Sequence, residues 1–271
     1  MSGMKKHWIA TAILESHRPF SNELRLEELA MIIGSTLSRC PGPGLFVFPA
    51  GHFCTGKDAP RTIYPWLEEK LTALIEKSGT TFALCFGIDG RQKIANDQIA
   101  CAVTSNGIEA KGRKFFPTKD EKYITELADG HQSLEDGLPR IFNFLGSRYY
   151  LAICYDSCGI SNSSFANPGC DAILNFVHGF QPRGQGPSGD VQFARKVFSG
   201  ASKRWGIPLY GSAVFFNRHI PDNWPSGVLW NKGADLSVSR WLYEYNPLRP
   251  AQQFPVLIPE GRASVRVFGH A

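Results

Sequence analysis

The stretch Leu151-Ala-Ile-Cys-Tyr-Asp156 decides how this chain is interpreted. Its apolar residues are typical of a buried strand, and the run ends abruptly at Cys154, directly before a polar Asp-Ser-Cys-Gly segment. A rigid strand fixes a thiol at its own end, and the turn after it offers backbone N–H groups to a developing negative charge. The stretch therefore predicts a strand that presents Cys154 as a nucleophile; the alternative is one more buried cysteine.

The composition is that of an ordinary soluble globular protein. The chain has 271 residues, of which 43% are apolar and 20% charged, enough for one domain with a substantial core. The formal net charge is +5, but the basic residues are scattered, so we expect no nucleic-acid partner. No apolar run approaches the roughly 18 residues of a membrane-spanning helix, so we expect no membrane partner.

The cysteines and histidines bear on the compartment and on metals. Seven cysteines, an odd number, form no CxxC pair, which favours a reducing compartment over a disulfide framework. The N-terminal residues lack the long apolar stretch of a signal peptide, so we expect a cytoplasmic protein. The seven histidines show no HxH or HExxH spacing, so we expect no metal site.

Strand-like and helix-like segments alternate almost throughout the chain. Helices are predicted from Ser21 or Asn22 to Leu37, over about Pro65–Lys77 and over Asp190–Trp205, with a helical turn or two near 120–128. The apolar runs predict strands over Trp8–Leu14, Leu45–Phe48, Thr81–Ile88, Ile99–Thr104, Ile108–Lys114, Ile141–Phe144, Tyr149–Cys154, Ala172–Val177 and Leu209–Phe216, with shorter candidates in the last 50 residues.

Two dipeptides punctuate these runs. Asp89-Gly90 is interpreted as a turn, and Asn106-Gly107 as the turn of a hairpin. Strands followed by helices, with hairpins between them, indicate an α/β fold. Two mixed sheets packed face to face with helices outside, in one domain over residues 1–271, would account for the number of strands.

Three segments in order resemble the signature segments of the nitrilase, or carbon–nitrogen hydrolase, superfamily. They are Leu45-Phe-Val-Phe-Pro49, Gly112-Arg-Lys-Phe-Phe-Pro117 and Ile153-Cys-Tyr-Asp156, and the stretch Gly169-Cys-Asp-Ala-Ile-Leu-Asn175 resembles a fourth family segment. The separations, 64 residues from position 50 to 114 and 40 from 114 to 154, are similar to those of the family.

The resemblance implies a four-layer αββα sandwich, commonly paired into a homodimer or higher homo-oligomer. It implies hydrolysis of a non-peptide C–N bond in a small amide, carbamoyl compound or nitrile, with Cys154 as nucleophile and a thioester intermediate. It also implies that Lys114, rather than Lys111, Lys119 or Lys122, holds the oxyanion, and that no cofactor is needed. The turn that contains Tyr155 would supply backbone donors.

The chain departs from the family at Ala50, where the general-base Glu is expected. The base has moved elsewhere, or the chain is an inactive relative that binds a ligand or partner protein, or a Glu was replaced by design; the sequence leaves these alternatives open. His52 would share the face of Ala50 if the strand continued, and a histidine near a thiol can serve as base. The alternative is a loop histidine exposed to water.

Three other residues are candidates for the pocket. Family members often carry a second Glu some 25 residues before the nucleophile, and Glu126 and Asp129 lie in that window, although solvent-facing loop positions would explain both. His178 follows the strand 172–177 and could line the mouth of the pocket, or be an ordinary hydrogen-bonded histidine at a strand end. Acyl transfer to an amine instead of water is compatible with the same residues.

Overall fold

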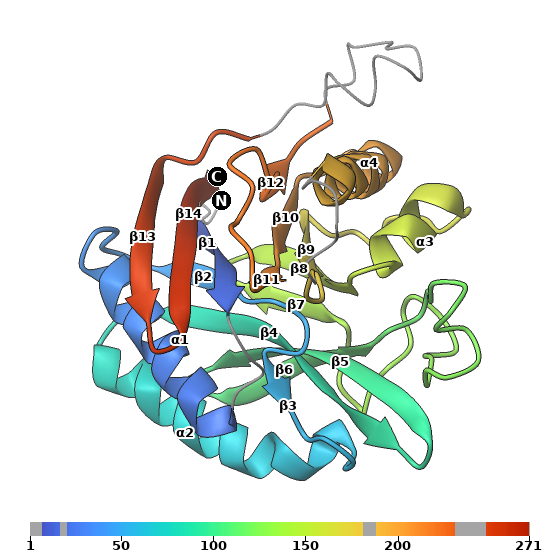
Figure 1. Ribbon diagram of the computed structural model, residues 1–271, viewed down its shortest axis with the longest axis horizontal. Helices are drawn as coiled ribbons and strands as arrows, with labels where there is room; N and C mark the ends of the chain where they lie inside the picture. The colour runs from blue at the N-terminus through green and yellow to red at the C-terminus, as the bar shows by residue number, and fades with distance from the viewer. Residues whose placement is uncertain (1–6, 17–20, 181–187, 231–247, 271) are drawn as a thin grey trace.

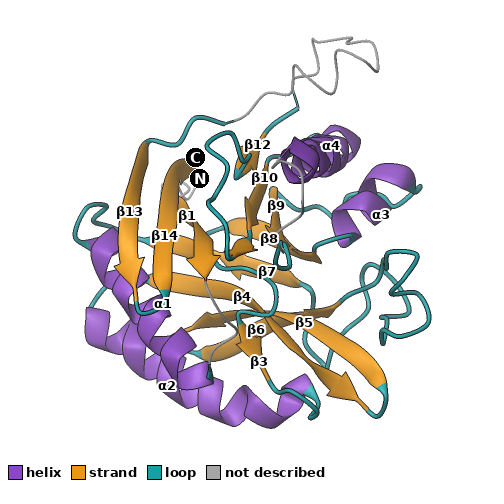
Figure 2. Ribbon diagram, in the orientation of Figure 1, coloured by secondary structure: helices purple, strands orange, loops and turns teal. Residues whose placement is uncertain are grey.

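Two β-sheets lie face to face in this protein, and helices cover the outer face of each (Figure 1, Figure 2). The computed structural model describes residues 7–16, 21–180, 188–230 and 248–270. One outer layer consists of α1 (Asn22–Leu37) and α2 (Tyr64–Ser78), and the other of α3 (Asp156–Asn162) and α4 (Ser188–Trp205). The predicted arrangement of two mixed sheets between outer helices is therefore confirmed.

The larger sheet has nine strands and combines parallel and antiparallel pairing. Its main path runs through β13 (Gln252–Ile258), β14 (Gly261–His270), β1 (His7–Ser16), β2 (Gly44–Val47), β4 (Phe82–Gln92), β5 (Ala95–Thr104) and β6 (Gly107–Arg113). Two short strands lie off this path: β3 (Phe53–Cys54) pairs with β4, and β11 (Val214–Phe216) pairs with β1. Strands β1, β2 and β4 are parallel neighbours, so their carboxyl ends meet at one edge.

The smaller sheet has five strands. In order they are β12 (Gly227–Val228), β10 (Leu209–Ser212), β9 (Ala172–Phe176), β8 (Ser147–Ile153) and β7 (Ile141–Phe144). Strands β8, β9 and β10 are parallel, and the two outer strands pair antiparallel. The residues that follow β8 and β9 therefore lie side by side, at the edge where α/β proteins commonly bind ligands.

Three apolar layers hold the sandwich together. The layer between the sheets contains buried side chains of both, including Val47, Leu151 and Leu174. A second layer packs α1 and α2 onto the larger sheet, and a third packs α3 and α4 onto the smaller one. Strands buried on both faces read as continuous apolar runs rather than as alternating ones, which explains why the strands were recognisable in the sequence.

The two helices on the larger sheet begin and end at residues suited to those positions. The Ser21 hydroxyl accepts a hydrogen bond from the Leu24 N–H at 3.3 Å and caps α1. Gly79, with φ +65°, ends α2 in the left-handed conformation that glycine adopts at no steric cost. Within the described ranges, none of the helices combines the length and apolar character needed to cross a membrane.

The structure corrects three of the predicted elements. Asp89-Gly90 is not a turn, because β4 continues to Gln92 and Asp89 pairs with Gln98 in β5. The predicted strand Leu209–Phe216 is two strands, since β10 pairs with β9 in the smaller sheet whereas β11 pairs with β1 in the larger one. No helix forms near 120–128, where Asn96 instead exchanges backbone hydrogen bonds with Ile124 and Glu126.

At Gly87, strand β4 lies very close to the backbone of Ala50. A substitution at Gly87 therefore tests this packing. A Cβ at Gly87 would lie 2.5 Å from the Ala50 Cα, and backbone cannot swing aside as a flexible side chain can. We predict that Gly87→Ala lowers the free energy of unfolding by about 1–3 kcal/mol in urea titrations. Gly34→Ala is the matched control: a Cβ there has nothing within 4 Å, so the variant should gain about 0.5–1 kcal/mol from helix propensity.

Candidate active site

Cys154 lies in a sharp turn between β8 and α3. Its φ is +47°, a left-handed conformation that is uncommon for a residue other than glycine. Its N–H donates to the Phe176 carbonyl at 2.8 Å, so the turn is fastened to the neighbouring strand β9. The residue is only partly buried, between the layer that joins the sheets and the layer under α4. The fold thus holds the thiol on a rigid strand end without sealing it inside the core.

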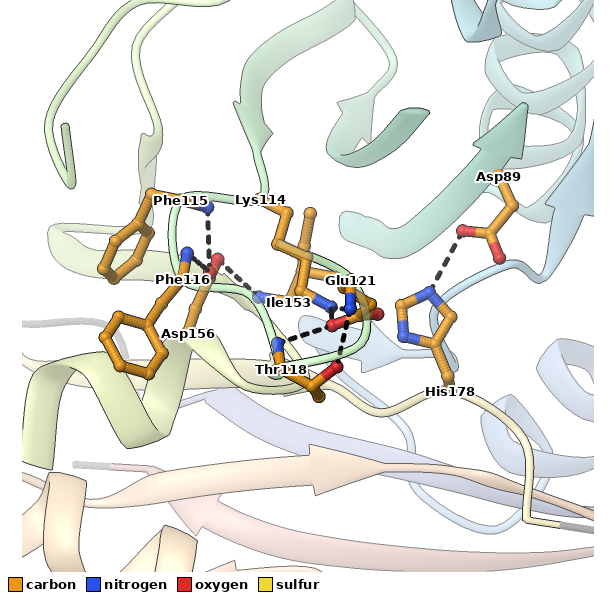
Figure 3. Close-up of polar contacts among 9 residues, drawn as sticks. All are labelled: Asp89, Lys114, Phe115, Phe116, Thr118, Glu121, Ile153, Asp156 and His178. Atoms are coloured by element: carbon orange, nitrogen blue, oxygen red, sulfur yellow. Dashed lines mark hydrogen bonds and ion pairs between the residues drawn. The ribbon is translucent and has the colours of Figure 1, made fainter. Parts of the chain in front are cut away.

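The Asp156 carboxylate joins this turn to the chain segment that carries Lys114 (Figure 3). It is fully buried, and its Oδ1 accepts from the N–H groups of Phe115 and Phe116 at 2.9 Å each. Its Oδ2 accepts from the Ile153 N–H and from Arg140 Nη1, both at 3.0 Å. One side chain therefore fixes the positions of both the nucleophile turn and the end of β6.

Lys114 makes a buried ion pair with Glu121. Its Nζ lies 2.7 Å from both carboxylate oxygens, and the lysine side chain has no exposed surface. Thr118 and Glu121 bond reciprocally, because the Thr118 N–H donates to Glu121 Oε2 at 2.8 Å and the Glu121 N–H donates to the Thr118 hydroxyl at 3.2 Å. Burial raises the pKa of Glu121, but these hydrogen bonds and the charges of Lys114 and His178 outweigh it and leave the pKa lowered.

His178 stands between Cys154 and Asp89. It follows β9, and its Nε2 lies 3.2 Å from Asp89 Oδ1, which belongs to β4 of the other sheet (Figure 3). Cys154 and His178 follow the neighbouring parallel strands β8 and β9, and each shifts the pKa of the other. Burial lowers the pKa of His178, but the Asp89 carboxylate and Cys154 together raise it to about 10. Cysteine, histidine and aspartate side chains, the residue types of known catalytic triads, are thus drawn here from both sheets.

The charges around Cys154 favour its thiolate. Burial raises the pKa of the thiol, but the hydrogen bond to His178 and the positive charges of His178 and Lys114 outweigh burial and lower it. The raised pKa of the histidine and the lowered pKa of the thiol both shift the pair toward its imidazolium–thiolate form. The thiolate is the form of a cysteine that attacks an electrophilic carbon.

Several residues predicted from the sequence do come together at this edge. Cys154, Lys114 and His178 interact, and Tyr155 follows in the same turn, half-buried at the start of α3. Ala50 is buried, and its N–H donates to the Val177 carbonyl at 3.3 Å, next to His178. The backbone at position 50 is thus bonded to the residue that precedes the histidine.

His52 lies elsewhere. Ala50 and Gly51 form a turn, with φ +60° at Gly51, so the two-residue alternation expected from a continuing strand is broken. The imidazole packs in the helix-side layer between Phe48 and Phe53, with its Nδ1 3.9 Å from Glu28 of α1. Burial, with the nearby charge of Arg25, lowers the pKa of His52 well below its ordinary value. It is a buried residue rather than the expected loop histidine, and its position does not support a role as base.

The carboxylate that pairs with Lys114 belongs to Glu121. It does not belong to Glu126 or Asp129, the two acidic residues that the sequence analysis named as candidates for the pocket. Glu126 is half-buried and bonds Asn96 through its backbone N–H at 2.7 Å, and Asp129 is exposed. The segment around them does support Lys114, since the Ala128 N–H donates to the Lys114 carbonyl at 2.9 Å. The sequence did contain a signal for Glu121. Thr118 and Glu121 have the spacing that is typical of reciprocal Thr–Glu hydrogen bonding, and Glu121 lies seven residues after Lys114.

Several solved structures have a fold similar to that of this chain. No protein-family model matches the chain, and no curated protein matches it. Among solved structures, it is similar to an amidase from Nesterenkonia sp. (TM-score 0.56, 13% identity, covering 97% of this chain and 90% of that one). It is also similar to a carbon–nitrogen hydrolase from Helicobacter pylori G27 (TM-score 0.57, 12% identity, 96% and 89% covered). At these identities the likeness shows that the chain shares the fold of these hydrolases.

The Asp156 contacts lead to a stability prediction. Asp156→Asn removes the charge that Arg140 pairs with in a site without exposed surface, and breaking a buried pair typically costs about 3–5 kcal/mol. We expect a loss of that order in urea unfolding, together with slower alkylation of Cys154 in the folded variant. Asp129→Asn, at an exposed position, should change neither; an Asp156→Asn variant as stable as the parent would contradict the assigned contacts.

Cys158 supplies an internal reference for the reactivity of Cys154. Both residues are partly buried in the same strand-to-helix segment, but burial raises the pKa of Cys158 to about 12, whereas the pKa of Cys154 is lowered. We predict that iodoacetamide modifies Cys154 before Cys158 at pH 7. The rate at Cys154 should fall as the pH drops through the lowered pKa of this thiol. Peptide mapping by mass spectrometry measures both sites, and equal slow labelling of the two would be the contrary result.

Proposed function

We propose that this chain is a carbon–nitrogen hydrolase of the nitrilase superfamily. It cleaves a small non-peptide amide, carbamoyl or nitrile substrate through a thioester at Cys154. The observation that carries the proposal is the meeting of Cys154, a thiol of lowered pKa, with the buried ammonium of Lys114 at the carboxyl ends of the strands. A nucleophile and an oxyanion donor need that proximity.

The structural neighbours support the substrate class. Another structure of the Nesterenkonia sp. AN1 amidase has TM-score 0.54 and 15% identity over 97% of this chain and 90% of that one. It carries the acetamide moiety of fluoroacetamide on its active-site cysteine. Further structures of that enzyme hold acrylamide and butyramide. Small aliphatic amides are therefore the first compounds to try on this chain.

Lys114 would stabilise the negative charge that develops on the substrate oxygen. An ammonium has three N–H donors, and the two Glu121 oxygens accept from at most two of them when both bind at 2.7 Å. The remaining donor would reach the oxyanion, together with backbone N–H groups of the turn at Tyr155. Glu121 would keep the lysine charged and fixed in direction, so that it need not reorganise during the reaction.

A ligand-binding relative without activity is the alternative that Ala50 supports. The lowered pKa of Cys154 favours the enzyme, because a site that only binds has no need of a poised thiolate. Acyl transfer to an amine uses the same residues and would appear as an amide product when amines are added. Cytoplasmic location and assembly as a homodimer stay predictions; all seven cysteines are free thiols, which supports a reducing compartment.

The activity prediction uses the purified full chain with acetamide, acrylamide and butyramide, and measures released ammonia. We expect turnover that Cys154→Ser abolishes. Lys114→Met should lower kcat by about 10²–10³-fold, the usual cost of removing one oxyanion donor. Lys119→Met, at an exposed lysine nearby, is the control and should retain full activity. Tight binding of amides with neither ammonia nor a Cys154 adduct would favour the ligand-binding alternative instead.

A further inference from the structure

The carboxylate missing at position 50 has a counterpart in the structure. We propose that His178, held by Asp89, is the acid–base group of this site, so that a Cys154–His178–Asp89 triad replaces the usual carboxylate beside the nucleophile. This inference rests on the proposed function for its substrate, but the pairing of thiol and imidazole is testable without one. The base would then follow β9 of the smaller sheet, whereas the family's Glu is expected at position 50, after β2 of the larger sheet.

The geometry around position 50 fits this substitution. The Ala50 N–H bonds the Val177 carbonyl, so the side chain at 50 and that of His178 start from adjacent backbone. Gly51, the next residue, leaves the space that Asp89 uses: a Cβ there would lie 2.6 Å from Asp89 Oδ2. Gly51 thus leaves room for the Asp89 carboxylate that pairs with His178, and a larger residue at position 51 would crowd it.

The surroundings of His178 suit a group that gains and loses a proton. Its side chain is 23% exposed and that of Asp89 33% exposed, so neither is sealed inside the core. In Figure 3 the Glu121 carboxylate lies between Lys114 and His178, so the imidazole has a carboxylate on each side. Asp89 fixes one ring nitrogen of His178, which is the part that the aspartate of a triad plays.

Glu121 is a poorer candidate for the base, although it lies close by. Its two oxygens accept hydrogen bonds from the Lys114 ammonium and the Thr118 N–H. Its pKa is lowered by these partners, and a carboxylate with a lowered pKa is a weak base. Cys154 and His178 follow neighbouring parallel strands, and among the groups that lower the pKa of the Cys154 thiol His178 has the largest effect.

The proton balance of the reaction can be written through this pair. The Cys154 thiolate attacks the carbonyl carbon, and the C=O π electrons move to the oxygen, where Lys114 holds the charge. As the tetrahedral intermediate collapses, the C–N bond breaks and the His178 imidazolium gives its proton to the departing nitrogen. The neutral imidazole then takes a proton from water as its oxygen attacks the thioester. Collapse of the second intermediate releases the acid and restores thiolate and imidazolium.

The test measures the pH profile of Cys154 alkylation by iodoacetamide in the full chain. In His178→Gln the inflection should move upward by at least about one pH unit, which is about a tenfold or greater loss of rate at pH values well below the parental inflection. Asp89→Asn should move it in the same direction by less. His219→Gln is the control, because that side chain is 89% exposed, and it should match the parent. A parental profile in both site variants would overturn the inference, whatever the enzyme hydrolyses.

Turnover then separates this inference from the proposed function. His178→Gln should lower kcat on any amide that is cleaved by about 10²–10⁴-fold. Ala50→Glu should bring no gain, since the site already has its base; a large gain would overturn the inference and show that a carboxylate was simply missing. If alkylation depends on His178 but no amide or nitrile is cleaved, the pairing of thiol and imidazole stands and the proposed substrate class fails.

Discussion

The Asp156 carboxylate is the interaction on which the site depends. Cys154 and Lys114 come from separate segments of the chain, and neither segment contacts the other through a strand ladder. Asp156 bonds the backbone on both sides of the gap and neutralises Arg140, so a single buried charge sets the distance between the thiol and the ammonium. Arg140 extends the same connection, because it also donates to the carbonyls of Leu151 and Arg113. A buried charge is stable only when hydrogen bonds compensate its lost hydration, and the Asp156 carboxylate accepts four.

The second constraint is that each positive charge near Cys154 is paired with a carboxylate. Glu121 holds Lys114, and Asp89 holds His178, so each cation has its own carboxylate and Cys154 faces both cations. Such an arrangement stabilises a thiolate without exposing an unpaired positive charge to the core. In the proposed triad, the base comes from the end of β9 and its carboxylate partner from β4, in place of a carboxylate at the end of β2.

The sequence predicted the layers well because strands buried on both faces appear as apolar runs. Three segments in order pointed to Cys154 and Lys114, and the positive charge of Lys114 does act on the Cys154 thiol. It failed where tertiary pairing overrides local composition. Asp89-Gly90 has the composition of a turn, but pairing with β5 carries the strand past it, so the residue that orients His178 was hidden. Glu121 was missed because the family's spacing pointed to Glu126. His52 was misplaced because the turn at 50–51 ends the alternation.

The most direct measurement is a crystal structure of the chain after reaction with fluoroacetamide. The account predicts a bond between Cys154 Sγ and the acetamide carbon, with the amide oxygen about 2.7–3.2 Å from Lys114 Nζ and His178 still paired with Asp89. An adduct on another cysteine, or an amide oxygen directed away from Lys114, would contradict the claim that these groups form one catalytic site.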